Sequence, residues 1–379
     1  MNQAAYPLDD TALEQFRRRH QIDPQHVRRF RNAMLKSFAS DTDVAAVLPH
    51  SDELQLHSLT LASQHDSMVD GATRLLFDTR SDLRLETVIL RIGQRKNTDV
   101  HSTDTAGNSS VRQNDAERRQ AINGRTTVCV SSQVGCAAAC SFCATGQMKV
   151  ARNLSTVEIL DQVVQAGQLL RAEGRSVNNV VFMGMGEPFH NESAVCSAVE
   201  QLLLPSHFDR SPRQILVSTV GIPDAMVRFA KRFPAVNLAL SLHSVRPEIR
   251  RSLIPLADRY PLKDLHAAIE TVNEIQNRPV MIEYLMLDQL NDSTTDSDLL
   301  CGWLAGLNCR INLIPFNPVS HAPQLNGSPE YRIQAFAETL RSAGFETTVR
   351  YSLGRDVAAA CGQLIREQQL KRPFSRGPQ

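Results

Sequence analysis

The hydrophobic and polar positions of the first third of the chain follow two different periods. Over residues 9–61, apolar residues recur at helical spacing among charged ones, which predicts a small helical region. Residues 72–78 and 83–92 are instead rich in β-forming residues and are separated by the polar turn 79–82. This part of the sequence therefore predicts helices followed by a β-hairpin.

The pattern of apolar and polar residues changes twice in the rest of the chain. Residues 93–124 are polar with very few apolar positions, which predicts a flexible insertion that does not pack into a core. After Arg125, short β-rich runs alternate with helical stretches, as is typical of βα units around a parallel sheet. The expected strands are residues 126–131, 179–183, 214–218, 237–241, 280–287 and 311–315.

Six such units predict an α/β fold with an incomplete (β/α)6-type barrel. The expected division of the chain is a helical accessory domain at 1–62, a hairpin connector at 63–92, the insertion at 93–124, the partial barrel at 125–350 and a C-terminal loop and tail at 351–379. Barrels of this kind carry their chemistry at the C-terminal ends of the strands. Unusual residues gather there, at 184–188, 218–219, 241–243 and 317.

Composition and charge narrow the class of protein. Of the 379 residues, 42% are hydrophobic, enough for a full-sized core, and no run of 18 apolar residues or signal-peptide layout is present. We therefore expect a cytoplasmic protein without a membrane segment. The near-neutral net charge of +1 hides a basic stretch at 16–36, which could meet a phosphate backbone or form an ordinary solvated helix face.

Three cysteines stand close together in a loop of small residues. Cys136, Cys140 and Cys143 have the spacing C-x₃-C-x₂-C. Three thiolates at this spacing can bind three corners of a four-iron cluster and leave the fourth iron open to a small molecule. A zinc site would need a fourth nearby Cys or His, and purely structural cysteines would need no such spacing. The pattern favours the iron–sulfur cluster over both alternatives.

With the aromatic Phe142 before its last cysteine, this loop resembles the radical S-adenosylmethionine motif. Further motifs follow at residues 129–136, 143–146, 152–154, 183–188, 241–243 and 359–364. In this set of motifs, which runs from about Glu86 to Leu364, the chain resembles the RlmN/Cfr family of radical S-adenosylmethionine RNA adenosine methyltransferases. Members of that family modify an adenosine of large-subunit ribosomal RNA and, in some cases, of transfer RNA.

The resemblance implies a role for each residue of a catalytic set. Cys136, Cys140 and Cys143 would hold one [4Fe-4S] cluster, and two molecules of S-adenosylmethionine per turnover would serve as methyl donor and radical source. Cys361 would carry the methyl group as S-methylcysteine, and Cys129 would release the product through a transient disulfide with Cys361. Glu86 would be the proton acceptor. The implied cofactor contacts are Gly186, Glu187, Ser218, Ser241, Leu242, His243 and Asn317.

From the residues alone, single cysteines such as Cys129 and Cys361 are more often core residues, so their roles rest on the resemblance. The resemblance also implies RNA as partner, an electron donor such as flavodoxin or ferredoxin, and a monomeric enzyme that methylates carbon 2 of adenosine in 23S rRNA or tRNA. Methylation of carbon 8 or of another RNA, and a non-enzymatic iron–sulfur RNA-binding protein, are the alternatives. Departures from the family pattern near Lys149 and Leu353 keep the RNA target open.

Overall fold

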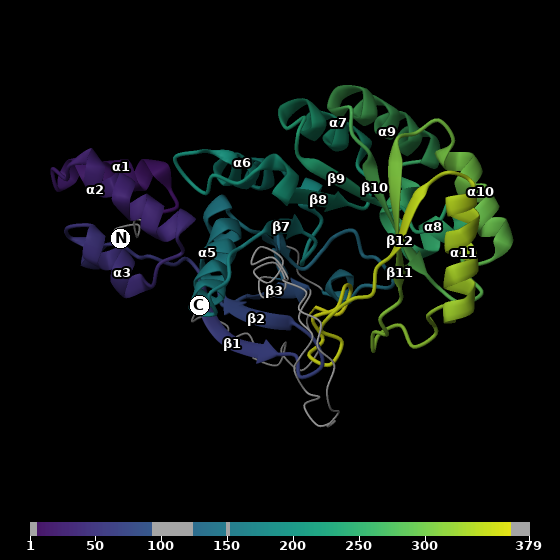
Figure 1. Cartoon of the computed structure of the whole chain (residues 1–379), viewed down its shortest axis with the longest axis horizontal. Helices are drawn as coiled ribbons and strands as arrows, with labels where there is room; N and C mark the ends of the chain where they lie inside the picture. Colours follow the sequence, from purple (N-terminus) through teal and green to yellow (C-terminus); the bar gives the residue numbers. More distant parts are fainter. Residues whose placement is uncertain (1–5, 93–123, 149–151, 365–379) are drawn as a thin grey trace, which may run out of the picture.

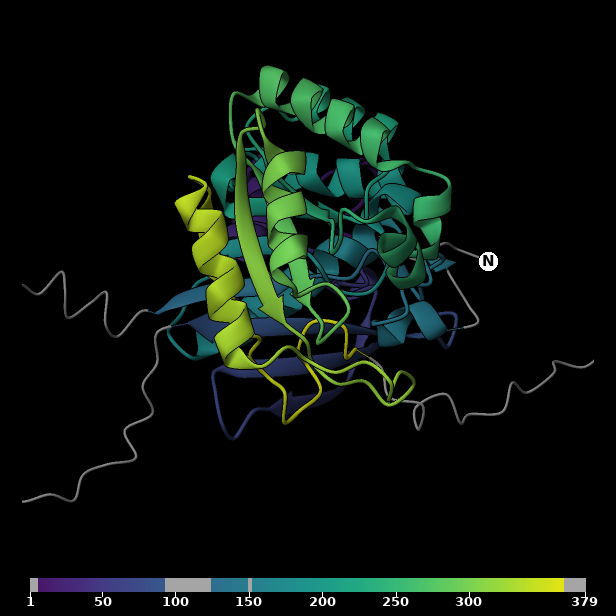
Figure 2. The same cartoon turned by 90° about the vertical axis from the view of Figure 1, so that its right-hand side faces the viewer.

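The computed structural model describes residues 6–92, 124–148 and 152–364. One curved sheet of ten strands organises these residues, with its helices on the outer face (Figures 1 and 2). The predicted insertion at 93–124 lies almost wholly outside the described residues, as does Lys149.

The parallel part of the sheet forms the incomplete barrel. Its strands run in the order β4, β7, β8, β9, β10, β11 and β12. The first six confirm the predicted strands, and β12 is a seventh that was not expected. The bounds are β4 Arg125–Cys129, β7 Asn179–Phe182, β8 Ile215–Thr219, β9 Asn237–Ser241, β10 Val280–Met286, β11 Cys309–Pro315 and β12 Glu346–Val349.

Antiparallel strands extend the sheet beyond β4. The predicted hairpin is present as β2 (Ala72–Asp78) and β3 (Arg84–Ile92), and β3 pairs antiparallel with β4. An unexpected strand, β1 (Thr60–Asp66), pairs with β2 and forms the outer edge. The short strands β5 (Gln133–Val134) and β6 (Arg152–Asn153) form a separate pair beside the cysteine loop.

The barrel helices begin at clear sequence signals. Ser155 and Glu158 form a capping box at α5, Ser293 and Asp296 do the same at α10, and α7 begins with Pro223 at its first position. The bounds are α5 Thr156–Ala172, α6 Glu192–Leu203, α7 Pro223–Arg232, α8 Pro247–Leu253, α9 Leu262–Gln276, α10 Thr294–Leu304 and α11 Glu330–Ser342.

The N-terminal helices pack against α5 (Figure 1). Phe38 lies directly over Gly167 of α5, where an added Cβ would come within 2.4 Å of the ring, so only glycine permits this approach. Arg171 also donates to the carbonyl of Ser37 at 2.7 Å. The helical region is thus joined to the barrel through a shared core; its helices are α1 Asp10–Arg19, α2 Pro24–Arg31 and α3 Asp41–Val47, with a π-helical turn at Asn32–Lys36.

A buried carboxylate fixes the connection between this region and β1. Asp161 of α5 is fully buried and accepts from the backbone N–H groups of Ser58 and Leu59 at 2.7 and 2.9 Å. Its other oxygen lies 2.6 Å from Nδ1 of His57. Burial lowers the pKa of His57, but the hydrogen bonds and charges of Asp161 and Asp41 outweigh this and raise the pKa to about 9.

We expect this histidine to make the stability of the fold depend on pH. A raised pKa in the folded state stabilises the protein fully below the ordinary pKa of 6.5, and the contribution is lost as the pH rises through about 9. The shift corresponds to roughly 3 kcal/mol in the free energy of unfolding. Urea unfolding of wild type and His57→Gln between pH 6 and 10 should give a difference that shrinks with rising pH; a constant difference would contradict the protonated pair.

Candidate active site

One cavity lies at the C-terminal ends of the barrel strands. Its lining includes all three cysteines of the loop, residues from the ends of β7, β8 and β9, and Cys361 from the far end of the chain. Of the residues expected to contact a cofactor, the lining contains Gly186, Glu187, Ser218, Ser241 and His243. The strand-end rule therefore located most of the site.

Two close contacts hold the cysteine loop that follows β4 and β5. Ser141 donates its backbone N–H to the carbonyl of Leu253 at 2.9 Å, and Gly146 packs so closely on Cys140 that an added Cβ would lie 2.9 Å from its backbone nitrogen. Burial raises the pKa of Cys136 to about 12, and the pKa of Cys140 and Cys143 is raised as well. Buried thiols at this spacing ionise only with a strong cationic partner, so they fit a metal cluster.

The spacing of these thiols bears on the kind of metal group that they could hold. Among the described residues, the one group of three metal-binding side chains whose ligand atoms all lie within 4.8 Å contains no cysteine. Two thiolates on one zinc ion lie about 3.8 Å apart, because each Zn–S bond is about 2.3 Å. Cys136, Cys140 and Cys143 do not form such a group, so at least one pair of their sulfur atoms lies more than 4.8 Å apart, which fits the separate irons of a four-iron cluster.

Glu187 offers a fixed, buried carboxylate to the cavity. Its Oε1 accepts from Thr219 Oγ1 at 2.7 Å and its Oε2 from the N–H of Val220 at 2.9 Å. Burial raises the pKa of Glu187, and these hydrogen bonds oppose the rise. The preceding Gly186 has φ +101° and an added Cβ would meet Gln133 at 2.6 Å, so glycine is required for this turn. A carboxylate next to backbone carbonyl oxygens can accept hydrogen bonds from an ammonium group.

The other predicted contacts divide into two groups. Ser218, Ser241 and His243 line the cavity, and the His243 ring meets Phe142 edge-on at 4.8 Å between centroids. Burial and the nearby Arg250 lower the pKa of His243 to about 3, so its imidazole is neutral. Leu242 is fully buried in the core and lies outside the cavity lining.

Asn317 also lies outside the cavity lining and holds the C-terminal loop. Its Nδ2 donates to Ser352 Oγ at 3.0 Å and to the carbonyl of Cys361 at 3.2 Å, while its Oδ1 accepts from Arg355 at 2.9 Å. The side chain is 2% exposed. The polar atoms of Asn317 therefore bond to the C-terminal loop and help to hold Cys361 in place.

Cys361 reaches the cavity because its loop is anchored at two distant places. Asp356 accepts from Ser67 Oγ at 2.8 Å, and Asp70 accepts from the N–H of Gly354 at 2.8 Å, which ties the loop to the turn between β1 and β2. At the other end, Ala144 of the cysteine loop donates to the carbonyl of Gly362 at 2.8 Å. The segment after β12, yellow in Figure 1, thus returns to the antiparallel strands.

Cys129 and Glu86 share one face of the sheet. Cys129 ends β4 and pairs with Val88 of β3, and Glu86 lies two positions before Val88 in β3, so its side chain is on the same face. Burial raises the pKa of Cys129 to about 12, the adjacent Cys361 adds to the rise, and Arg350 opposes it. Glu86 is fully buried beside Arg74, with 3.2 Å between Oε1 and Nη1, and lies outside the cavity lining.

Comparisons with known proteins agree with this site. The Radical SAM superfamily model matches residues 130–299. A probable RNA methyltransferase of Rhodopirellula baltica is 50% identical over 95% of this chain and 87% of its own length. The chain belongs to the RlmN-like family of radical S-adenosylmethionine RNA methyltransferases.

Two further relatives support the membership of the chain in the RlmN-like family. A probable dual-specificity RNA methyltransferase RlmN of Thermus thermophilus is 42% identical over 70% of this chain and 75% of its own length. The crystal structure of a radical SAM methyltransferase from Sphaerobacter thermophilus superposes with a TM-score of 0.80, with 36% identity over 93% of this chain and 96% of that chain. Radical SAM membership implies a [4Fe-4S] cluster and S-adenosylmethionine as cofactors.

Sequence reasoning missed three charged residues at the site of this RlmN-like chain. Glu283 of β10 lines the cavity, accepts from Asn312 at 3.1 Å, and keeps its buried Oε2 without a hydrogen bond among the described residues. Arg350 lines the cavity 3.9 Å from Glu283. Arg250 is buried behind the cysteine loop and donates to the carbonyls of Ser241, at 3.0 Å, and of Leu242.

The basic stretch expected from the sequence forms part of a surface groove in this RNA methyltransferase. The groove is lined by Arg17, Arg28, Arg31, Lys36 and residues of the loop after α6. Some of its charge is paired, because Glu14 contacts Arg17 at 2.7 Å and Asp10 contacts Arg31. Within residues 6–92, 124–148 and 152–364, no helix combines the length and apolar character needed to cross a membrane.

Proposed function

We propose that this chain methylates carbon 2 of an adenosine in 23S rRNA or tRNA, with Cys361 as the carrier of the methyl group. The observation that carries the proposal is the meeting of Cys361 with Cys136, Cys140 and Cys143 in one cavity. The anchored C-terminal loop brings Cys361 to the three loop cysteines, which are far from it in the sequence. A cysteine placed beside a cofactor site and open to solvent can receive a group and then deliver it.

The three loop cysteines are the proposed ligands of the [4Fe-4S] cluster. When bound, the cluster and S-adenosylmethionine supply a methyl group and a 5′-deoxyadenosyl radical, which is the chemistry an unreactive ring C–H requires. Glu187 and the backbone at Gly186 offer acceptors for the methionine ammonium, and Ser218 and Ser241 offer hydroxyl groups further along the same cavity. Arg250 places a buried positive charge behind the loop that holds the thiolates.

Cys361 acts first in the proposed sequence. Its thiolate attacks the sulfonium methyl, a new S–CH₃ bond forms, the old sulfonium bond breaks, and S-adenosylhomocysteine leaves. Hydrogen abstraction from that methyl leaves a methylene radical on Cys361, which adds to the adenine ring. The guanidinium of Arg350 lines the same cavity, and its charge opposes the rise in the pKa of Cys129.

Cys129 and Glu86 complete the cycle in this proposal. Glu86 accepts the ring proton, and the Cys129 thiolate attacks the sulfur of Cys361. The disulfide forms as the sulfur–methylene bond breaks, and the methylene carbon keeps the electron pair and takes a proton to become the methyl product. The one unpaired electron that remains after the radical addition would return to the [4Fe-4S] cluster, which supplies one electron at the start. The position of Glu86 on the same face as Cys129, with Arg74 as its counterion, supports this role.

The basic groove is the proposed contact for the RNA backbone. We expect replacement of Arg28 and Arg31 on α2 by Gln to weaken RNA binding by about tenfold or more and to flatten its salt dependence, because each lost phosphate contact removes about 0.7 from the slope of log K against log salt. Fluorescence anisotropy with an RNA hairpin at several salt concentrations measures both quantities.

The matched control for the groove is Arg228→Gln with Arg232→Gln on α7, where the arginines pair with Glu192 and Glu200 at 2.7 Å. This variant should bind RNA as the wild type does. If the α2 variant binds RNA with the affinity and salt dependence of the wild type, the prediction is wrong and these arginines form an ordinary solvated helix face.

The chemical outcome distinguishes carbon 2 from carbon 8. Ribosomal and transfer RNA should be incubated with reconstituted protein, a flavodoxin or ferredoxin reducing system and S-adenosylmethionine, digested to nucleosides, and compared with 2-methyladenosine and 8-methyladenosine standards by mass spectrometry. We expect 2-methyladenosine. If only 8-methyladenosine appears, the methylated position is carbon 8 and not carbon 2. If neither RNA contains a methylated adenosine, the proposed function is refuted.

A further inference from the structure

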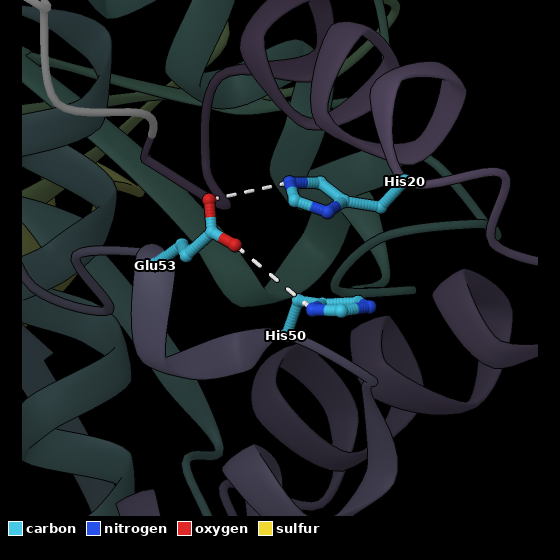
Figure 3. A group of neighbouring side chains, drawn as sticks. All are labelled: His20, His50 and Glu53. Carbon is cyan, nitrogen blue, oxygen red and sulfur yellow. Dashed lines mark ion pairs between the residues drawn. The ribbon is translucent and has the colours of Figure 1, made fainter.

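A cluster of metal-binding side chains lies in the N-terminal helical region, away from the cysteine cavity. His20, His50 and Glu53 point toward one another, and their ligand atoms all lie within 4.8 Å (Figure 3). Nε2 of His20 is 3.3 Å from Glu53 Oε2, and Nδ1 of His50 is 3.9 Å from Glu53 Oε1. Two imidazoles and one carboxylate thus bring their ligand atoms close together.

Local backbone structure brings the two histidines together. His20 is the C-cap of α1, and its ring packs between Phe16 and His50, with ring centroids 4.6 Å from each. His50 has φ +59°, in the left-handed region that non-glycine residues seldom occupy, directly before the short helix Ser51–Glu53. This strained residue turns the chain so that its imidazole stacks on His20.

The polar atoms of the cluster are poorly satisfied as they stand. Nε2 of His20 is buried and makes no hydrogen bond among the described residues, because its approach to Glu53 has an unfavourable angle. Arg19 reaches Glu53 only at 4.0 Å, and its side chain is 69% exposed, so it can move away. A cation at the centre would satisfy His20 and take the place of this distant guanidinium.

We propose that His20, His50 and Glu53 bind a zinc ion, a site that goes beyond the proposed RNA methylation. Zinc takes four tetrahedral ligands and accepts both imidazole nitrogen and carboxylate oxygen, so three protein ligands leave one position for water. Bonds of about 2.0–2.1 Å require ligand atoms about 3.3 Å apart. The exposed side chains of His50 and Glu53 make the small inward movement, while the more buried His20 stays fixed.

Zinc at this position links two separate elements of the helical region. It joins the end of α1 to the turn that follows α3, next to the basic groove formed with α2. A metal that binds only the folded arrangement stabilises it by mass action. We therefore expect added zinc to raise the melting temperature of wild type more than that of a variant lacking one ligand.

The test uses the full-length protein with its iron–sulfur cluster reconstituted, so that iron occupies the loop cysteines. Zinc should be titrated against a chromophoric chelator for wild type, His50→Asn and Glu53→Gln. Asparagine tolerates the left-handed backbone of residue 50, and Glu53 is exposed, so both variants should fold. We expect one zinc fewer, or at least tenfold weaker binding, in both variants, whereas the control His26→Asn on α2 should match wild type.

X-ray absorption at the zinc edge supplies the second readout. The expected spectrum has nitrogen and oxygen neighbours at about 2.0–2.1 Å and no sulfur neighbour at about 2.3 Å. A sulfur shell would place the metal on cysteines and overturn the site. Equal stoichiometry and equal affinity in wild type, His50→Asn and Glu53→Gln would overturn it as well, whatever the result for RNA methylation.

Discussion

Replacement of Cys129 by Ala should leave the enzyme covalently attached to its RNA. In the proposed sequence, the methylene group on Cys361 can still add to adenine, but no neighbouring thiol remains to form the disulfide that frees the product. Cys129 is held at the end of β4, and its thiol interacts electrostatically with Cys361, so the proposal gives it the resolving role. A denaturing, nonreducing gel with labelled RNA should show a slower protein–RNA band, and turnover should stop after one event.

The double variant Cys129→Ala, Cys361→Ala is the essential comparison. Without Cys361 there is no carrier, so neither the covalent band nor methylated RNA should form, while the iron content stays at the wild-type level. Cys301→Ala on α10, outside the cavity, should turn over normally. Normal turnover by Cys129→Ala without an adduct, or RNA methylation by Cys361→Ala, would rule out the two-cysteine mechanism.

Replacement of Cys140 by Ala should abolish activity altogether and leave a folded, colourless protein. Two thiols are too few to hold the cluster. Cys140 belongs to the smaller apolar cluster with Leu253 and Ile254 and not to the main core, so the fold should survive the change. Since rate enhancements of about 10⁶ or more depend on the cofactor, methylation should fall below detection. Iron and sulfide analysis after anaerobic reconstitution, the visible spectrum and circular dichroism test these expectations together.

A second cysteine controls for nonspecific effects of the change. Cys196 on α6 is also buried, but it lies far from the cavity lining, so Cys196→Ala should keep its iron, colour and activity. Any loss of stability in that variant measures the packing cost of a removed thiol. A Cys140→Ala protein with a full complement of iron and sulfide would show that the cluster ligands lie elsewhere.

The sequence predicted the central sheet well because its strands are short, apolar and regularly spaced. The two strands it missed lie at the edges. In β1, the sequence TLASQHD is mostly exposed and has no apolar alternation, and β12 has only four residues. An edge strand is held mainly by backbone hydrogen bonds to one neighbour. These bonds do not require a particular pattern of apolar side chains, so the sequence gives little sign of the strand.

The site was predicted less evenly, for physical reasons. Glu283 could have been found, because it interrupts the otherwise apolar strand sequence VMIEYLM. Arg250 could not, since it precedes Arg251 in a polar helix and only the structure shows which of the two is buried. The hydrogen bonds from Ser67 and Gly354 that seat the Cys361 loop join segments nearly 290 residues apart, which local pattern does not report.

A label carried by Cys361 tests the central claim most directly. Protein without RNA is first incubated with S-adenosylmethionine bearing a labelled methyl group, and mass spectrometry of the Cys361 peptide measures the label. The protein is then freed of small molecules and given RNA, reductant and unlabelled S-adenosylmethionine. The account predicts that the first methylated adenosine carries the label and that the peptide loses it in equal amount. Unlabelled methyladenosine, with the label still on Cys361, would contradict it.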